Sequence, residues 1–509
     1  MMTPPQQSSP CVVCDVGAPH KQYTLCVRKN VWMNDVNANV IYCNYEIVIL
    51  LLVMKKRTVK KNQSRKAWVL TVDMGYGHQR AAYPMEDIAF EGVIAVNDYK
   101  GLPKEERETW HRSREGYEWI SRVQSRSFIG RTLFNLFDKI QEIPHFYPRR
   151  DLSRPNLQLL HTYDLIERQG ICRDLFMRVL KKNNTIPLYC TFFIPAFAAE
   201  MYDYPGEIYL QVCDADVSRS WVPRHPGKSR IKYCAPNRRV VERLREYGVK
   251  PENIFFTGFP LPKENVGGLE MKTLREDIGA RIYNLDPRKM MTHKFGHIIT
   301  YHLGGQKLVK KATHPLTLTF AVGGAGAQRD LGVAIVNSLK EKILKKQICL
   351  NLIAGTRPDV AEFFKGVIKE AGLNAQLGKH INILFEKTKH EYFVAFNQVL
   401  RTTDVLWTKP SELSFYAGLG IPLIMAPSLG SQEDFNRVWL KTIGAGISQD
   451  DPHYTHEWLF DWIESGWLAR AALNGFSEAP VLGTYTVEKL VTEGPDHVGM
   501  MDKKSPMAW

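Results

Sequence analysis

The chain twice repeats one local pattern, a short apolar run followed by a glycine loop and a helical stretch. The first copy has the apolar run 67–72, then Gly75-Tyr76-Gly77-His78, and opens a helix at Gln79. The second has the run 316–322, then Gly323-Gly324-Ala325-Gly326, and a helix over 330–345. A short apolar run bounded by glycines is typical of a strand buried on both faces of a sheet. The repeat therefore predicts two domains, each built on a parallel sheet.

Short apolar runs alternate with helical stretches through both halves of the chain. Further strands are expected at 92–97, 186–191, 207–212, 231–234 and 253–257 in the first half, and at 348–353, 381–384, 405–408 and 423–426 in the second. This alternation predicts an α/β fold with helices on both faces of each sheet. We expect an extension at 1–53, a first domain at 54–262, a linker and insertion at 263–315, a second domain at 316–465, and C-terminal helices at 466–509.

Residues 1–53 differ in composition from the rest of the chain, and we expect them to be disordered. They hold four of the nine cysteines, and Met54 is followed by Lys-Lys-Arg. We expect the functional fold to start after them, with Met54 as the natural start. The competing interpretation is an interfacial anchor made by the apolar run 47–54 and the basic residues after it. A zinc site is an alternative for the cysteines of this segment, although they are not spaced as two close pairs. These cysteines are Cys11, Cys14, Cys26 and Cys43.

The formal net charge is +14, which fits an anionic substrate, an anionic membrane face or nucleic acid. Nucleic acid ranks last, because no DNA- or RNA-binding motif is present. The five cysteines after residue 53 are scattered, as in a reduced cytoplasmic protein. No apolar run approaches the ~18 residues of a membrane-spanning helix.

A polar cluster follows a predicted strand of the second half. Its residues are Thr408-Lys409-Pro410-Ser411-Glu412, then Gly420-Ile421-Pro422, then Gly430-Ser431-Gln432-Glu433-Asp434-Phe435-Asn436. We interpret them as a strand end, a helix, a second strand and a polar loop. An amide and two carboxylates at the carboxyl end of a strand can bind the hydroxyls of a sugar.

This cluster resembles the donor-sugar loop of GT-B glycosyltransferases, in particular the diacylglycerol glycosyltransferases, monogalactosyldiacylglycerol synthases and lipid II N-acetylglucosaminyltransferases. Their pattern is Thr-Lys-Pro/Ala-Gly, then Gly-Leu/Val-Pro, then Gly-Gln-Glu-x-x-Asn, and Lys409, Gln432, Glu433 and Asn436 fall on it. The resemblance covers most of 67–470 in four motifs. It implies the GT-B fold, with two Rossmann-like doubly wound domains facing across a cleft and terminal helices crossing back to the first domain.

One position departs from the family pattern. The family places a ribose-binding glutamate seven residues before the last proline of the second motif, where this chain has Phe415. Glu412 lies three residues earlier on the same helical face, and we expect it to take over the ribose contact. The departure leaves the identity of the donor nucleotide open.

The first glycine loop holds a candidate base. Gly75 and Gly77 let the backbone approach a ligand, and a histidine such as His78 can take a proton from a hydroxyl. The resembling family has Gly-Gly-Gly-His or Gly-Asn-Gly-His here, with the histidine near the acceptor. Asp214 follows a predicted strand, as the family's Thr-Asp does, and is either the supporting group or the competing base. The non-catalytic alternatives are a histidine with a structural role and an aspartate exposed to solvent. Thr257-Gly258 and the prolines that follow are interpreted as structural.

The second glycine loop is a candidate for the donor diphosphate. Backbone N–H groups of Gly323, Gly324 and Gly326 can cradle phosphate. The loop lacks the Gly-Lys-Ser/Thr ending of a Walker sequence and the spacing of a dinucleotide motif, which disfavours a nicotinamide cofactor. Arg357, after the next strand, is either a donor contact or a surface residue.

Aromatic and basic residues alternate over 110–150, from Trp110 to Arg150. This composition suits an anionic lipid surface, although core aromatics beside a solvated face are commoner. In the resembling enzymes this region meets the acceptor, so we expect acceptor or membrane contact here.

The resemblance implies a cytoplasmic glycosyltransferase, peripheral on the inner membrane face if the acceptor is a lipid. It would move a hexose or N-acetylhexosamine from a nucleoside diphosphate sugar, expected to be a uridine one, to an acceptor hydroxyl with inversion. No cofactor or metal is expected, because fixed positive groups can stabilise the leaving diphosphate. The alternatives are a nucleotide-sugar epimerase, a non-catalytic sugar-nucleotide-binding protein and a membrane scaffold.

Overall fold

The structure is a computed structural model, and it describes residues 66–112, 143–305, 308–321, 328–428 and 430–497. The predicted extension 1–53, the glycines of the second glycine loop and most of the aromatic and basic segment 110–150 lie outside the described residues. Across these five ranges, no helix has both the length and the apolar character needed to cross a membrane.

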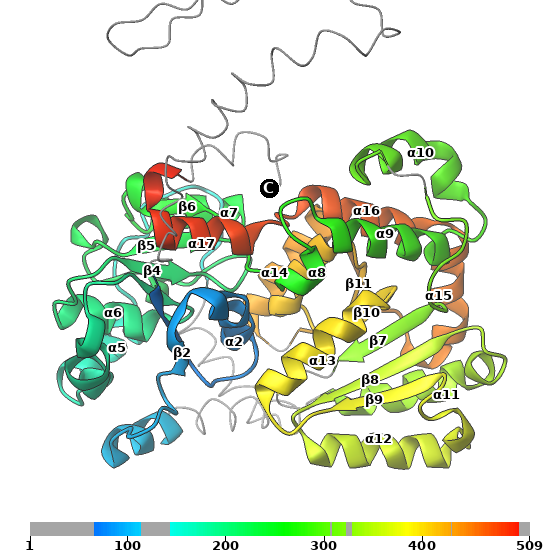
Figure 1. Cartoon of the computed structure of the whole chain (residues 1–509), viewed down its shortest axis with the longest axis horizontal. Coiled ribbons are helices and arrows are strands. Elements are labelled where there is room, and N and C mark those ends of the chain that lie inside the picture. The colour runs from blue at the N-terminus through cyan, green and yellow to red at the C-terminus, as the bar shows by residue number, and fades with distance from the viewer. Residues whose placement is uncertain (1–65, 113–142, 306–307, 322–327, 429, 498–509) are drawn as a thin grey trace, which may run out of the picture. The chain divides into compact units, whose positions relative to one another are not determined.

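Two six-stranded parallel sheets form the framework (Figure 1). The first has the order β2-β1-β3-β4-β5-β6, with β1 (Ala67–Thr71), β2 (Ala89–Ala95), β3 (Leu188–Cys190), β4 (Ile208–Gln211), β5 (Lys232–Ala235) and β6 (Ile254–Phe256). The second has the order β12-β11-β10-β7-β8-β9, with β7 (Thr317–Ala321), β8 (Cys349–Gly355), β9 (Ile381–Phe385), β10 (Val405–Thr408), β11 (Leu423–Met425) and β12 (Gly446–Ser448). The predicted fold, α/β with two Rossmann-like domains in the GT-B arrangement, is confirmed.

Eleven of these twelve strands were predicted from the apolar runs of the sequence. The second strand, predicted to begin at residue 92, begins three residues earlier, at Ala89. The strand that the sequence missed is β12, a Gly-Ile-Ser segment at the edge of the second sheet. It has one apolar residue, so no run marks it, and its place is set by pairing with β11.

The first sheet is buried on both faces, as alternation along its strands shows. Trp68, Leu70 and Val72 point into one apolar cluster, and Ala67 and Val69 into another. Because successive side chains of a strand point to opposite faces, helices must cover both. The helices of this half include α2 (Gly77–Ala82), α5 (Leu157–Glu167), α6 (Phe193–Met201) and α7 (Arg238–Glu246), together with the 3-10 segment η1 (Tyr83–Ile88).

Helices also surround the second sheet. They are α11 (Arg329–Leu344), α12 (Pro358–Glu370), α13 (Lys389–Arg401), the 3-10 segment η8 (Glu412–Leu419), α14 (Ser431–Thr442), α15 (Thr455–Glu464) and α16 (Trp467–Glu478). The chain turns between α15 and α16 at Gly466, which adopts a left-handed backbone conformation with a φ of 69°.

The segment between the sheets, predicted as a linker and an insertion, contains three helices among the described residues. It contains α8 (Lys263–Val266), α9 (Lys272–Leu285) and α10 (Met290–His302). Shorter segments elsewhere are η2 (Leu175–Val179), η3 (Leu180–Asn183), η4 (Arg219–Trp221), η5 (Pro226–Lys228), η6 (Pro251–Asn253), η7 (Asn374–Gln376), η9 (Pro452–Tyr454) and η10 (Pro495–His497).

The last long helix, α17 (Gly483–Glu493), packs on the first sheet (Figure 1). Val487, Leu490 and Val491 share a cluster with Ala67 and Val69 of β1.

A Cβ on Gly258 would lie 2.6 Å from Pro480 Cβ, and the φ of Gly258 is 82°. The structural interpretation of Thr257-Gly258 is therefore confirmed.

Candidate functional site

The described site residues predicted from sequence follow the carboxyl ends of parallel strands. His78 comes after β1, Asp214 after β4, Arg357 after β8 and Lys409 after β10, and α14 follows β11. In such sheets, ligands bind beyond the carboxyl ends at the point where the strand order reverses. These points are β1/β3 in the first sheet and β7/β10 in the second.

His78 lies at the first of these points. Its Nδ1 is 2.7 Å from the carbonyl oxygen of Thr191, the residue that follows β3. A carbonyl only accepts, so Nδ1 donates and Nε2 carries the lone pair. Burial lowers the pKa of His78 to about 4, although the Thr191 hydrogen bond and the charge of Glu412 act in the opposite direction. The imidazole is therefore neutral at pH 7.

Aromatic rings hold the imidazole of His78 in place. Its centroid is 4.9 Å from that of Phe192 and 5.8 Å from that of Trp221. Together with the Thr191 hydrogen bond, these rings fix the direction of Nε2. Gly75, with a φ of 97°, makes the turn before the helix.

Asp214 meets a residue of the second half directly. Asn436 Nδ2 donates to Asp214 Oδ1 at 3.0 Å, and the N–H of Ala215 donates to Asn436 Oδ1 at 2.7 Å. Burial raises the pKa of Asp214 to about 6; the Asn436 hydrogen bond opposes this rise, and the charges of Glu412 and Glu433 add to it. The loop after β4 and the helix α14 after β11 therefore meet at a carboxyl group with a raised proton affinity.

Asn436 is fully buried, and its amide is engaged within the protein. Besides Asp214 and Ala215, it donates to the carbonyl oxygen of Pro410 at 3.1 Å. Both N–H groups are used, so in this arrangement Asn436 links the two halves. Its contact with a donor sugar stays a prediction.

The predicted polar loop is the first turn of a helix, so that part of the sequence interpretation was wrong. Ser431–Thr442 is α14, preceded by Gly430 in an extended conformation. Glu433 and Asp434 lie in its first turn, where the helix dipole favours negative side chains, and this preference competes with a loop. Lys409 forms an ion pair with Glu433. Gln432 is partly exposed beside Glu433.

Glu412 lies against the first glycine loop. A Cβ on Gly77 would lie 3.3 Å from Glu412 Oε2, so glycine permits this approach. Glu412 Oε1 accepts from Arg80 Nε at 3.1 Å, and Arg80 Nη2 donates to the hydroxyl of Tyr392 at 2.7 Å. The ribose contact of Glu412 stays a prediction, and its observed partner is a buried arginine of the other half.

The remaining predicted residues occupy the end of β8 and the second glycine loop. Tyr76 accepts from the N–H of Thr356 at 3.0 Å, so the first glycine loop touches the end of β8. Arg357 forms two hydrogen bonds with Asp359, at 2.9 and 3.0 Å. Gly323, Gly324 and Gly326 lie outside the described residues, but Gln328 after them donates to the carbonyl oxygen of Pro427 at 2.9 Å.

Three residues at this contact, Arg80, Tyr76 and Tyr392, were not predicted as site residues. Arg80 is 2% exposed, and its guanidinium carbon is 4.6 Å from the ring centroid of Phe396 and 5.2 Å from that of Tyr392. The glycine loop pattern indicates backbone contacts with a ligand. It contains no sign of a side chain whose partners are more than 300 residues away.

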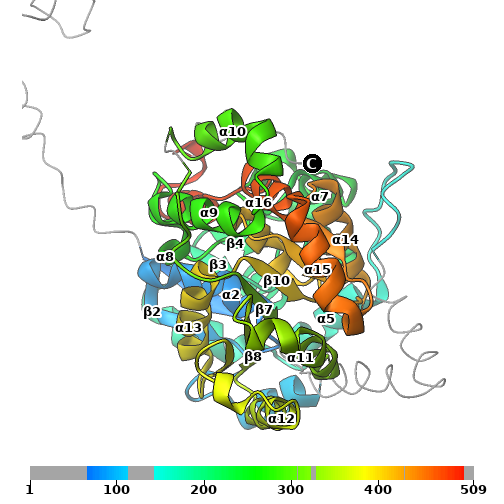
Figure 2. The ribbon, with the colours of Figure 1, turned by 90° about the vertical axis from the view of Figure 1, so that its right-hand side faces the viewer.

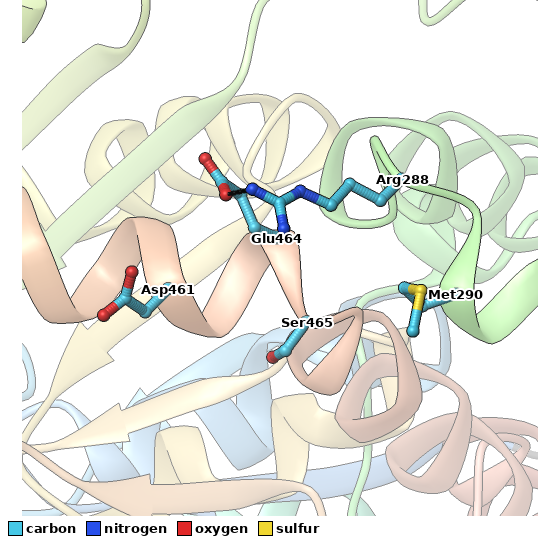
Figure 3. A pocket seen from close by; sticks show the side chains of 5 residues that line it. All are labelled: Arg288, Met290, Asp461, Glu464 and Ser465. Carbon is cyan, nitrogen blue, oxygen red and sulfur yellow. Dashed lines mark hydrogen bonds and ion pairs between the residues drawn. The ribbon is translucent and has the colours of Figure 1, made fainter.

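A hollow of about 380 Å³ lies elsewhere, beside the end of α15 (Figure 3). It is lined by Arg288, Met290, Asp461, Glu464 and Ser465. Arg288 forms an ion pair with Glu464. None of these residues is a predicted site residue.

Residues 367–460 match a family described as a domain of unknown function (DUF6938). They include Lys409, Glu412, Gln432, Glu433 and Asn436. No curated protein matches the chain.

Several solved structures are similar to the chain. HepE of Anabaena in complex with UDP and glucose is 12% identical, with a TM-score of 0.40 over 84% of this chain and 98% of that one. MurG of Acinetobacter baumannii is 11% identical, with a TM-score of 0.36 over 74% and 95%. UDP-GlcNAc 2-epimerase of Neisseria meningitidis, bound to UDP-GlcNAc, is 10% identical, with a TM-score of 0.38 over 67% and 84%. The fold assignment rests on the strand order of the two sheets.

Proposed function

We propose that the chain is a GT-B glycosyltransferase that moves a hexose or N-acetylhexosamine from a uridine diphosphate sugar to an acceptor hydroxyl, with inversion. The donor would lie at the carboxyl ends of the second sheet and the acceptor beside His78. We place the reaction in the cytoplasm, and a membrane lipid is the acceptor class that the sequence resemblance favours.

One observation carries this proposal. Asn436 joins Asp214 across the two halves, which places a titratable carboxyl group of the first beside the polar first turn of α14 in the second. Lys409 and Glu433 form an ion pair, and the charges of both act on the Asp214 carboxyl group. The amide of Gln432, the carboxyl groups of Asp214 and Glu433 and the ammonium group of Lys409 suit the hydroxyls and diphosphate of a sugar nucleotide.

His78 is the proposed base. Its Nε2 would take the acceptor proton as the acceptor oxygen bonds to the anomeric carbon. The bond from that carbon to the diphosphate oxygen would break, and the diphosphate would leave with the electron pair. A base with a pKa of about 4 is free at pH 7 but holds a proton weakly. Asp214, with a pKa of about 6, is therefore the competing base.

Fixed positive groups would stabilise the leaving diphosphate. Lys409 follows β10 at the switch point of the second sheet, and the N-terminus of α14 faces the same end of the sheet. Backbone N–H groups of Gly323, Gly324 and Gly326 complete the proposed set. Because these groups supply positive charge, we propose that transfer needs no metal, so that a chelator leaves the rate unchanged.

A transfer assay tests the proposal. The full chain is incubated with labelled UDP-glucose, UDP-galactose or UDP-N-acetylglucosamine and a bacterial lipid extract, and label in the organic phase is measured. We expect transfer from at least one donor, reduced by roughly two to four orders of magnitude in His78→Ala. Conversion of one sugar nucleotide into another without acceptor would show an epimerase instead. Absence of both reactions with all three donors would contradict the proposal.

A further inference from the structure

The segment 287–314, which connects the two halves, is strongly cationic. Its 28 residues include six of the 67 lysines and arginines of the chain and none of its 53 acids. The flanking Asp286 is turned inward, where it accepts from the N–H groups of Met291 and Thr292. Acids reach this segment from α15, where Glu464 pairs with Arg288, and where Asp461 and Glu464 line the hollow beside Met290.

Within this segment, α10 has two distinct faces. Met291, Ile299 and the partly buried Phe295 pack into the core cluster. The outer face carries Met290, His293, Lys294, His297 and Tyr301, which follow one another at helical spacing. Together with Lys289, we call these five residues the α10 surface. Figures 1 and 2 both show α9 and α16 between α10 and the strands, so α10 lies on the far side of these two helices from the sheets.

The α10 surface exposes apolar side chains among its cations. Tyr301 is 81% exposed and Met290 is 59% exposed. Lys289 and Lys294 are exposed, and neither forms an ion pair with a described residue. Val309, Lys310 and Lys311 follow in an exposed stretch, and Val309 lies 3.8 Å from where a Cβ on Gly279 of α9 would be.

We propose that the α10 surface docks the protein on an anionic lipid bilayer. The lysines of the α10 surface would be attracted to the phosphate headgroups of such a bilayer. The hydrocarbon below the headgroups can accept the apolar side chains of Met290 and Tyr301. A nucleic acid would use the cations but would leave Met290 without an apolar partner. The surface belongs to α10 and is separate from the segment 110–150, and the proposal stands whether or not the chain transfers sugar.

Co-sedimentation of the full chain with vesicles tests the docking. We expect binding to vesicles of equal parts phosphatidylglycerol and phosphatidylcholine, weaker binding at high salt, and little binding to phosphatidylcholine alone. Each surface cation contributes roughly fivefold to such binding, so Lys289→Glu with Lys294→Glu should weaken it at least tenfold. The matched control, Lys365→Glu with Lys369→Glu on α12, makes the same charge change on another exposed helix.

A second variant separates a bilayer from other polyanions. Met290→Ser with Tyr301→Ser should weaken vesicle binding severalfold and leave binding to a single-stranded oligonucleotide unchanged. Unaltered melting temperatures would show that both variants fold. The proposal is overturned if the α10 charge variant binds vesicles like the wild type, if the control loses as much, or if the Met290 and Tyr301 changes have no effect on vesicles.

Discussion

At the scale of single residues, two partly buried titratable groups have their pKa values moved in opposite directions by the same cause. Burial disfavours the charged form, so it lowers the pKa of the His78 imidazole and raises that of the Asp214 carboxyl. Between pH 6.5 and about 4, the unfolded chain binds the His78 proton and the folded chain does not. The free energy of unfolding therefore decreases as the pH falls through this window, because His78 is held neutral in the folded chain.

The two groups predict different pH–rate profiles. If Asp214 must be ionised for transfer, kcat falls as the pH drops below about 6, because the carboxyl group takes up a proton there. If His78 alone must be free, the fall comes near pH 4. We expect the wild type to show the higher value and Asp214→Asn, with lower kcat, to show the lower one. An acid limb near 6 that persists in Asp214→Asn would contradict this assignment.

The sequence could predict those parts of the site that depend on local features, and it could not predict those that depend on contacts between distant residues. His78, Asp214 and Lys409 could be proposed because each follows a strand, and strand ends are local features. The position of α14 could not, because a polar segment after a glycine suits a loop or a first helical turn equally. The pairing of Arg80 with Glu412 joins residues 332 positions apart, and a single sequence contains no local mark of it.

At the scale of elements, the contact of α2 with η8 and α13 links the two halves. Arg80 of α2 is 2% exposed and Glu412 of η8 is 12% exposed, so the charges of this pair are largely removed from water. Tyr392 of α13 accepts from the same guanidinium. Burial opposes the charge of Arg80, but Tyr392, Tyr416 and Glu412 together raise its pKa, and the residue stays charged. Removing one partner would leave the other buried and unpaired.

Arg80→Met should therefore destabilise the protein strongly, by roughly 3–5 kcal/mol. The exposed pair Lys365–Glu362 provides the control, since Lys365→Met should cost less than about 1 kcal/mol. Urea denaturation of both variants measures the difference. Arg80→Met combined with Glu412→Gln should cost less than the two single changes added together. Equal midpoints for Arg80→Met and Lys365→Met would show that the pair contributes little.

At the scale of the whole molecule, the segments that follow the carboxyl ends of the strands bring the two halves, each built on a parallel sheet, into contact. The sequence could predict both sheets because buried parallel strands form continuous apolar runs. It could not predict β12, which has a single apolar residue, or the helices at 263–302, whose apolar positions are interrupted by charges. Where the two halves meet, we propose that Gln432 and Glu433 hold the sugar of the donor.

Calorimetric titration of Gln432→Ala tests this claim most directly. At least one of UDP-glucose, UDP-galactose and UDP-N-acetylglucosamine should bind the wild type, and Gln432→Ala should weaken that binding by roughly 1–3 kcal/mol while barely changing the affinity for UDP. Glu433→Ala should weaken binding of the sugar nucleotide too, but it also removes the ion pair with Lys409. Asp434→Ala is the control, because Asp434 is exposed and pairs with Arg437 on the same helix. If sugar nucleotide and UDP weaken equally in Gln432→Ala, or if none of them binds the wild type, the account is contradicted.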